Sequence, residues 1–247
     1  MLRFIAAAIL MIAVTASAQP SKFALELEAG PVWQSYNDVE IPNDGTATRF
    51  SLKDLTGSGP WFSARAYLTW NINDRHGIRA LAAPLSITET AVTTDPIRFA
   101  GADFAAGVST EATYKFNSWR LGYRYTFGGG GEVWTWRLGF TAKIRDAKIA
   151  LSQGDVSSEK TDLGFVPLLH VSTDWQFTNG WFMLLDIEAL AGGPGRAEDV
   201  SLKLSHELSP KWSIAGGYRL VEGGADVEEV YNFAWFHFAV LSTTLRF

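Results

Sequence analysis

The chain has 247 residues, a formal net charge of −5 at pH 7 and no cysteine. The missing cysteines exclude disulfides and thiolate-bound metals, and the mild acidity gives no indication of nucleic-acid binding. With 10 Trp, 16 Phe and 23 Gly residues, the sequence is rich in aromatic residues and glycine. Its fold must therefore be stable without covalent cross-links.

The first eighteen residues, MLRFIAAAILMIAVTASA, are typical of a secretory signal peptide. Arg3 supplies the positive n-region, residues 4–14 the apolar region, and Ala16-Ser17-Ala18 a cleavage site of small residues. The segment is shorter than the roughly 20 apolar residues of a spanning helix, and no later run is a better candidate. We expect residues 1–18 to be removed and residues 19–247 to form one domain.

Apolar and polar residues alternate through nearly all of the remaining sequence, which predicts β-strands. In SWRLGYRYTF, for example, Trp119 and Leu121 share one face while Arg120 and Arg124 point the other way. Ten such segments are predicted, near residues 23–36, 60–72, 76–89, 112–127, 133–150, 162–177, 181–191, 198–208, 212–222 and 230–247.

The connections between these segments alternate in length. Tight turns are expected at NDR, GGGGE, TNG and SPK, and longer connections at NDVEIPNDGTATRFSLKDLTGSG, TAVTTDPIRFAGADFAAGVSTE, SQGDVSSEKT, GGPGRAE and EGGADVEE. Both termini lie on the side of the tight turns, as in outer-membrane barrels, whose periplasmic turns are short and whose extracellular loops are longer. The predicted fold class is all-β: a closed antiparallel transmembrane β-barrel of about ten strands, with eight or twelve as alternatives.

Tryptophans gather at one end of the predicted strands. Those on the apolar face within a few residues of a tight turn are Trp70, Trp134, Trp136, Trp175, Trp181 and Trp212. Around a closed sheet they would form an aromatic belt at one membrane–water interface, and Trp33, Tyr218 and Trp235 are candidates for the opposite, extracellular belt. A soluble β-sandwich or lipocalin-type barrel is disfavoured, because its outer face would expose an arginine on strand after strand.

The last residues, AVLSTTLRF, place Leu241, Thr243, Leu245 and Phe247 on the outward face. They resemble the C-terminal assembly signal of the Gram-negative outer-membrane β-barrel family. The stretches AKIRDAKI, GRAEDV and NFAWFHFA also resemble small outer-membrane proteins without an assigned role. The resemblance implies insertion by the barrel-assembly machinery and contact with outer-membrane lipids and lipopolysaccharide, and it supplies no activity.

With the apolar face toward lipid, the polar face points into the lumen. The charged or titratable residues expected there are Glu26, Glu28, Arg65, Arg120, Arg124, Arg137, Lys143, Arg145, His170, Asp174, Asp186, Glu188, Asp199, Lys203 and Arg219. A ten-stranded barrel is near the size that side chains fill. Because unpaired buried charges are costly, we expect opposite charges to pair across the interior and plug it. Arg79 stays undecided between lumen and periplasmic rim, because GIRALAAPLSI alternates poorly.

The predicted function is a structural or surface-interaction role for a plugged barrel, with a narrow passive channel for small polar solutes as the alternative. No metal, cofactor or nucleic acid is expected, and the ligand of the surface loops stays open. The acidic residues Glu222, Asp226, Glu228 and Glu229 are assigned to a solvated outer loop, with divalent-cation binding as the weaker hypothesis.

Two enzyme hypotheses are weaker than the structural one. The stretch HVS resembles the His-x-Ser spacing of outer-membrane lipid A deacylases, and Asp174 continues the face that carries His170 and Ser172. Alternate residues of one strand lie about 7 Å apart, too far for direct hydrogen bonds, and these three point into the lumen rather than toward lipid. No Ser–His–acid relay is therefore predicted.

The second enzyme hypothesis is an omptin-type protease, which also has ten strands and uses acidic residues with a histidine at the extracellular mouth. Here Asp162 and Asp199 would lie in the upper lumen. The histidines fall elsewhere: His76 and His206 near the periplasmic side, and His237 on the lipid-facing register. The chain is therefore not expected to be an enzyme.

Overall fold

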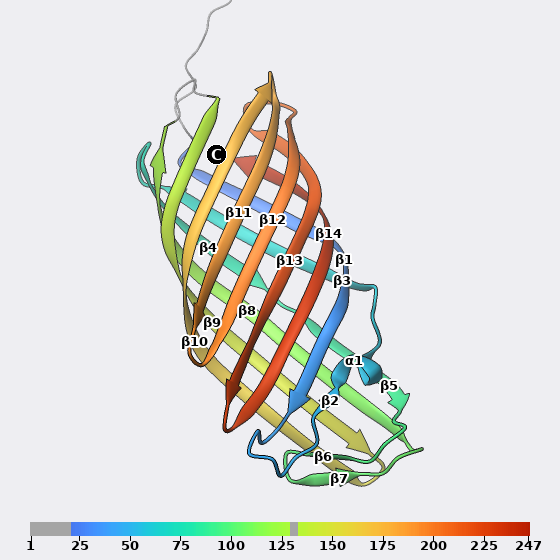
Figure 1. The fold of residues 1–247 in the computed structure, drawn as a ribbon. Helices are drawn as coiled ribbons and strands as arrows, with labels where there is room; N and C mark the ends of the chain where they lie inside the picture. Colours follow the sequence, from blue (N-terminus) through green and yellow to red (C-terminus); the bar gives the residue numbers. More distant parts are fainter. Residues whose placement is uncertain (1–20, 129–132) are drawn as a thin grey trace, which may run out of the picture.

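The computed structural model describes residues 21–128 and 133–247 as an elongated barrel of tilted strands (Figure 1). Ten strands close the ring, each antiparallel to its neighbours, which confirms the predicted fold class. They are β1 (Phe23–Glu40), β3 (Trp61–Asn71), β4 (His76–Ala83), β8 (Ser109–Phe127), β9 (Trp134–Gln153), β10 (Val156–Thr178), β11 (Trp181–Gly192), β12 (Gly195–Glu207), β13 (Trp212–Val227) and β14 (Val230–Arg246). The predicted signal peptide and most of the turn at GGGGE lie outside the described residues.

The barrel closes between its first and last strands. The β1–β14 ladder runs from Ala24 paired with Arg246 to Glu40 paired with Tyr231. The end of the barrel that carries the short turns is its inner end, and the end that carries the long connections is its outer end. At the inner end the amide of Phe23 donates to the carbonyl oxygen of Phe247 at 2.8 Å, and the reverse bond measures 2.9 Å. Closure of this kind lets backbone groups find ladder partners without water.

A band of exposed apolar side chains covers the outward face of the barrel wall. It includes Leu27, Leu68, Leu121, Phe140, Leu169, Leu202, Ile214 and Leu241, from eight different strands. Each alternates with an inward residue of the same strand, as the period of two requires. In the described part of the chain, no helix has the length and apolar character to cross a membrane.

Three outer connections are tighter than the sequence indicated. The stretches SQGDVSSEKT, GGPGRAE and EGGADVEE are mostly strand, and the hairpins β9–β10, β11–β12 and β13–β14 turn within two residues. The prediction of long connections is therefore wrong at these places. Above the apolar band the outward face of the β9–β10 hairpin becomes polar, as the ion pair Lys148–Glu159 at 3.6 Å illustrates. Alternation is lost there although the ladder continues.

The two remaining outer connections are long and fold over the outer end of the barrel (Figure 1). They contain β2 (Phe50–Ser51), α1 (Leu52–Thr56), β5 (Ser86–Val92), β6 (Ile97–Phe99) and β7 (Ala102–Phe104). β5 continues the wall beside β8 beyond Pro84, where β4 has ended. The connections are bonded together, since the amide of Thr48 donates to Arg98 at 2.9 Å and that of Ala100 to Ile41 at 2.8 Å. Sequence analysis predicted neither α1 nor the β6–β7 hairpin.

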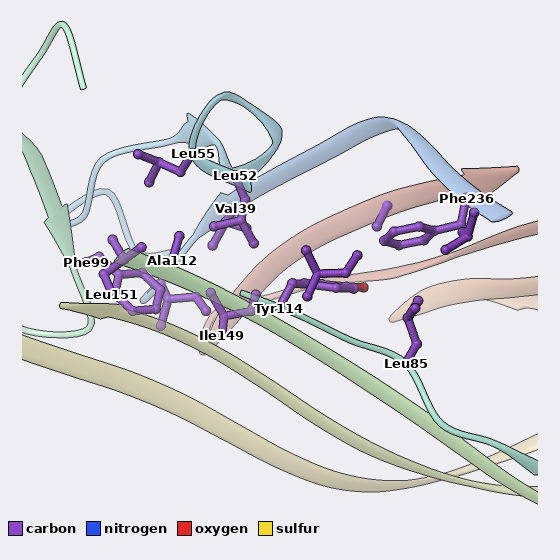
Figure 2. Packing of buried hydrophobic residues seen from close by; sticks show 14 of the residues in the cluster. Val39, Leu52, Leu55, Leu85, Phe99, Ala112, Tyr114, Ile149, Leu151 and Phe236 are labelled. Atoms are coloured by element: carbon purple, nitrogen blue, oxygen red, sulfur yellow. The ribbon is translucent and has the colours of Figure 1, made fainter. Parts of the chain in front are cut away.

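An apolar core lies in the outer half of the lumen, where a polar interior was expected. Inward residues of β1, β8, β9 and β14 converge there with side chains of both long connections (Figure 2). The residues labelled in Figure 2 are Val39, Leu52, Leu55, Leu85, Phe99, Ala112, Tyr114, Ile149, Leu151 and Phe236. The expectation of a uniformly polar lumen is thus wrong for the outer half. The long connections supply apolar groups that exclude water from it.

Gly217 of β13 lies where the backbone of β12 passes very close. A Cβ atom there would be 2.1 Å from the carbonyl oxygen of Leu202, so Gly217→Ala must force the two strands apart. We expect a loss of about 1–3 kcal/mol, typical of overpacking, measured as a lower unfolding temperature of the folded barrel on semi-native gels. Gly193→Ala is the control, because its Cβ would meet nothing within 4 Å. Equal unfolding temperatures for the two variants would contradict the expected clash.

Candidate functional site

Charged side chains from opposite sides of the barrel meet around Asp199 of β12. Arg65 of β3 and Arg120 of β8 each reach a carboxylate oxygen of Asp199 at 2.8 Å. Arg219 of β13 binds the other oxygen and also donates through Nε to Oε1 of Glu28 at 2.9 Å. Three guanidinium groups therefore converge on a single buried carboxylate, and Glu28 provides a second negative charge.

The network continues from Arg120 to the opposite wall through Glu188 of β11. Arg120 pairs with Glu188, which also accepts from Arg79 Nη2 at 3.0 Å. Arg79 donates to Asp186 at 2.6 Å, and the Nε2 atom of His170 lies 3.2 Å from the same carboxylate. Arg79, left undecided by the sequence, thus points into the lumen. No clear signal in the sequence indicates this, because both faces of the strand are apolar around Arg79: Ile78 and Ala80 on one, Leu81 and Ala83 on the other.

Lys203 of β12 extends the network toward the inner mouth. Its Nζ atom lies 3.0 Å from Oε2 of Glu28 and also binds Glu26. The lumenal residues joined in one network are Glu26, Glu28, Arg65, Arg79, Arg120, His170, Asp186, Glu188, Asp199, Lys203 and Arg219. They come from β1, β3, β4, β8, β10, β11, β12 and β13.

Five of the expected lumenal residues stand outside this network. Arg137 pairs with Asp174 at 2.7 Å near the inner mouth. Arg124 donates to the hydroxyl of Thr69 at 3.3 Å and makes no ion pair within the described residues. Arg145 pairs with Asp162 in the outer half. Lys143 forms no ion pair within the described residues and lines a cavity in the outer half.

The network divides the lumen into two cavities. The inner one has a volume of about 250 Å³ and is lined by Glu26, Arg137, Asp174 and Lys203, among others. The outer one has a volume of about 700 Å³ and is lined mainly by apolar side chains, but its lining also includes Lys143. The two cavities share no lining residue. The layer of Arg65, Arg120, Glu188, Asp199 and Arg219, all buried, lies between them.

The six tryptophans singled out by the sequence point outward near the inner end of the barrel. Each is exposed, and several stack: the rings of Trp134 and Trp175 lie 5.2 Å apart, and Trp70 stacks on Phe23 at 6.5 Å. Trp33, Tyr218 and Trp235 are also exposed and outward. His237, assigned to the lipid-facing register, lies beside them and binds the hydroxyls of Ser35 at 2.7 Å and Tyr218.

The C-terminal residues with outward register lie along the seam. Leu241, Thr243 and Leu245 pair with Ala29, Leu27 and Leu25 of β1, respectively. Phe247 is exposed, and its ring stacks on Phe23 with centroids 5.8 Å apart. These residues therefore lie on the outward face of the wall, in the part of β14 that leads to the inner end.

His170, Ser172 and Asp174 do not form a catalytic relay. His170 binds Asp186, Asp174 binds Arg137, and the Oγ atom of Ser172 is buried without a hydrogen-bond partner in the described residues. Asp199, expected in the upper lumen, lies instead in the central network, because three arginines hold it there. His76 contacts the hydroxyl of Tyr123 at 2.6 Å, and His206 the carbonyl oxygen of Gly180 at 3.0 Å, both away from the outer mouth.

The acidic outer residues are held by protein partners. Glu222 belongs to β13 rather than to a loop, is buried and pairs with Arg196. Asp226 accepts from the side-chain amide of Asn43 at 2.8 Å. The assignment of Glu222 and Asp226 to a solvated loop is therefore wrong, because the β13 ladder extends through both residues.

No protein-family model matches the sequence, and no curated protein sequence matches it either. Among solved structures, the outer membrane protease OmpT from Escherichia coli is similar with a TM-score of 0.54, at 8% identity, over 92% of this chain and 97% of that one. The translocator domain of autotransporter NalP from Neisseria meningitidis gives a TM-score of 0.41 at 11% identity, covering 94% and 90% of the two chains. The chain has the fold of a Gram-negative outer-membrane β-barrel. That fold supports an outer-membrane location, and at 8% identity the likeness to OmpT concerns the fold alone.

Removing Arg219 should destabilise the barrel strongly, because it leaves Glu28 and Asp199 buried with less compensation. We expect Arg219→Met to cost about 3–5 kcal/mol of unfolding free energy, as for other broken buried pairs. Urea titration of the protein folded in lipid vesicles measures this. Arg98→Met is the matched control: Arg98 pairs with Asp103 at 3.1 Å on the exposed β6–β7 hairpin, and exposed pairs contribute about 0–1 kcal/mol. Similar losses in the two variants would show that the network is not the stabilising element.

Proposed function

We propose that the protein is a non-conducting outer-membrane barrel that acts on other molecules through its outer half. The observation that carries this proposal is the ion-pair layer across the lumen. Its members Arg65, Arg120, Glu188, Asp199 and Arg219 are buried and come from the five strands β3, β8, β11, β12 and β13, with the arginines bound to Asp199 and Glu188. A channel for polar solutes needs a continuous water path, which a layer of mutually bonded side chains blocks.

Electrostatics favour a closed layer over a loose one. A carboxylate removed from water is costly unless opposite charges and hydrogen bonds replace its hydration. Asp199 has three arginine partners, and Glu188 accepts from Thr141 of β9 at 2.9 Å in addition to two arginines. Moving Asp199 or Glu188 out of the layer would break several ion pairs and hydrogen bonds together. We therefore expect the plug to be a static part of the fold.

The outer half carries the features expected of an interaction surface. Its two long connections are held in place, and Asn43 of the first is bonded to the carbonyl oxygen of Glu228 at the β13–β14 tip at 2.8 Å. Asp44 accepts from the amide and hydroxyl of Thr46 at 2.9 and 2.6 Å. These hydrogen bonds, with the hydroxyl contributing most, lower the pKa of Asp44, so its carboxylate keeps its charge to a lower pH than an ordinary aspartate.

The proposed partners follow from the same surfaces. The apolar band and the outward tryptophans suit contact with outer-membrane lipids and lipopolysaccharide. The outward residues Leu241, Thr243, Leu245 and Phe247 are the proposed signal for the barrel-assembly machinery. Residues 1–18 are the proposed export signal.

Conductance across planar bilayers tests the plug. We expect the wild-type barrel to give no long-lived conductance steps. Arg120→Ala/Glu188→Ala should produce them, because it removes a pair that spans β8 and β11 between the two cavities. Lys115→Ala/Asp146→Ala removes a pair on the outward face, 2.7 Å apart, and should leave the barrel closed. Wild-type steps whose size changes in Arg120→Ala/Glu188→Ala would instead establish the passive-channel alternative.

A further inference from the structure

The barrel wall is interrupted twice in its outer half. The β3–β4 ladder begins only at Ala66 of β3, and the β10–β11 ladder only at Leu169 of β10. The first interruption is covered, because α1 lies against β1, β5 and β8. In addition, the indole Nε1 of Trp61 donates to Oε1 of Glu89 at 2.9 Å, joining β3 to β5.

At the second interruption, the second long connection contacts the outer tip of β10, where β7 lies against the strand and the hydroxyl of Ser158 donates to the carbonyl oxygen of Ala100 at 2.8 Å. The part of β10 at Val166 and Pro167 instead lines the outer cavity. Residues 156–165 of β10 extend beyond the end of β11 at Gly192, and residues 166–168, which are level with residues 190–192 of β11, pair with β9 but not with β11. Pro167 lies in this stretch, and proline, which lacks an amide hydrogen, is confined to sheet edges and bulges. The tip of the β11–β12 hairpin is bonded to the opposite neighbour, since the amide of Asp226 on β13 donates to the carbonyl oxygen of Pro194 at 3.1 Å.

The outer cavity reaches this opening. Its lining includes Val166 and Pro167 on the β10 side and Leu190 and Gly192 on the β11 side. Leu190 shares the inward register of Glu188 and is nevertheless exposed, so its side chain borders open space. The cavity volume of about 700 Å³ falls within the roughly 300–1,000 Å³ of small-molecule sites. Further apolar lining comes from Ile41, Tyr114, Phe116, Ile149, Ala197 and Val230.

A buried cation without an acidic partner lies at the height of the opening. Lys143 is paired across the ladder with Val166 and is only 3% exposed. Within residues 21–128 and 133–247 it makes no ion pair, and its Nζ atom lies over the ring of Phe116, 4.6 Å from the centroid. A buried ammonium group is costly without an anionic or hydrogen-bonding partner. The site is therefore electrostatically incomplete.

Arg145 adds a second cation one register step farther out. It is paired across the ladder with Gly164 and forms an ion pair with Asp162. Its Nε atom is nevertheless buried without a hydrogen-bond acceptor in the described residues. Lys160 on β10 also lines the cavity, against Asp162 and Glu229 as the lining carboxylates. The surplus of positive charge and the unused donors both call for an anionic ligand.

We propose that the outer cavity binds a single-chain amphiphile with a carboxylate headgroup, which enters from the membrane between β10 and β11. The carboxylate lies on Lys143 and Arg145, and the alkyl chain packs along Tyr114, Phe116 and Ile149. The ion-pair layer beneath the cavity stops the ligand from passing into the inner half, so the inference deepens the proposed surface role and rests on the plug.

Binding of radiolabelled palmitate to the barrel in phosphatidylcholine nanodiscs tests the proposal. Wild-type discs should retain about one palmitate per barrel more than empty discs. Lys143→Met should weaken binding at least tenfold, because methionine has nearly the length of lysine but lacks its charged hydrogen-bond donor. Lys115→Met is the matched control: Lys115 faces outward on β8, pairs with Asp146 and does not line the cavity, so its binding should equal that of the wild type.

Further measurements test the need for a charged headgroup, the route of entry and the folding of each variant. Hexadecanol, which lacks the charge, should compete at least tenfold less well than unlabelled palmitate. Leu190→Trp should weaken binding by filling the opening, and semi-native gels report whether each variant is folded. Wild-type binding no greater than that of empty discs, or equal binding by wild type, Lys143→Met and Leu190→Trp, would overturn the proposal. A conducting wild-type barrel would refute the plug but would not change these binding values, so the two failures are distinguishable.

Discussion

The position of Asp199 decides how the interior of this barrel is organised. One carboxylate on β12 receives guanidinium groups from β3, β8 and β13, strands that lie on different sides of the ring. Arginines gathered around one acid repel one another, so further carboxylates are needed, and Glu28 and Glu188 supply them. The layer is therefore collective: each ion pair makes the next one tolerable, and the cross-section of the lumen is set by the reach of these side chains.

Above and below this layer the same ten strands enclose different environments. The inner cavity is polar and bordered by Arg137 and Asp174, whereas the outer half is closed by an apolar core to which both long connections contribute. The apolar band and the aromatic rings of the outward face do not follow this division of the lumen, because their composition is set by contact with the membrane. The inward and outward faces of the same strands therefore follow independent patterns of polarity.

The sequence was most informative where one face of a strand met lipid. Alternation located every wall strand, and the register of Arg120, Glu188 and Arg219 assigned them inward correctly. It failed where that contrast disappears: the upper part of β10, in which outward residues such as Glu159 and Thr161 are polar, read as a loop. The burial of Leu52 and Leu55 in α1 depends on tertiary contacts that five residues of sequence do not encode. Likewise, the pattern placed Lys143 in the lumen, but its lack of an ion pair emerges only from the neighbours it meets in three dimensions.

The folding of the long connections into the lumen also bears on how this protein can vary. Surface loops are ordinarily the places where insertions and substitutions are best tolerated. Here Phe99 and Phe104 of the second connection are buried in the core, so changes in that loop carry the cost of changes in a protein interior. The tip formed by Gly154 and Asp155, exposed at the end of the β9–β10 hairpin, bears no such load. Sequence drift and the display of a foreign epitope are best accommodated there.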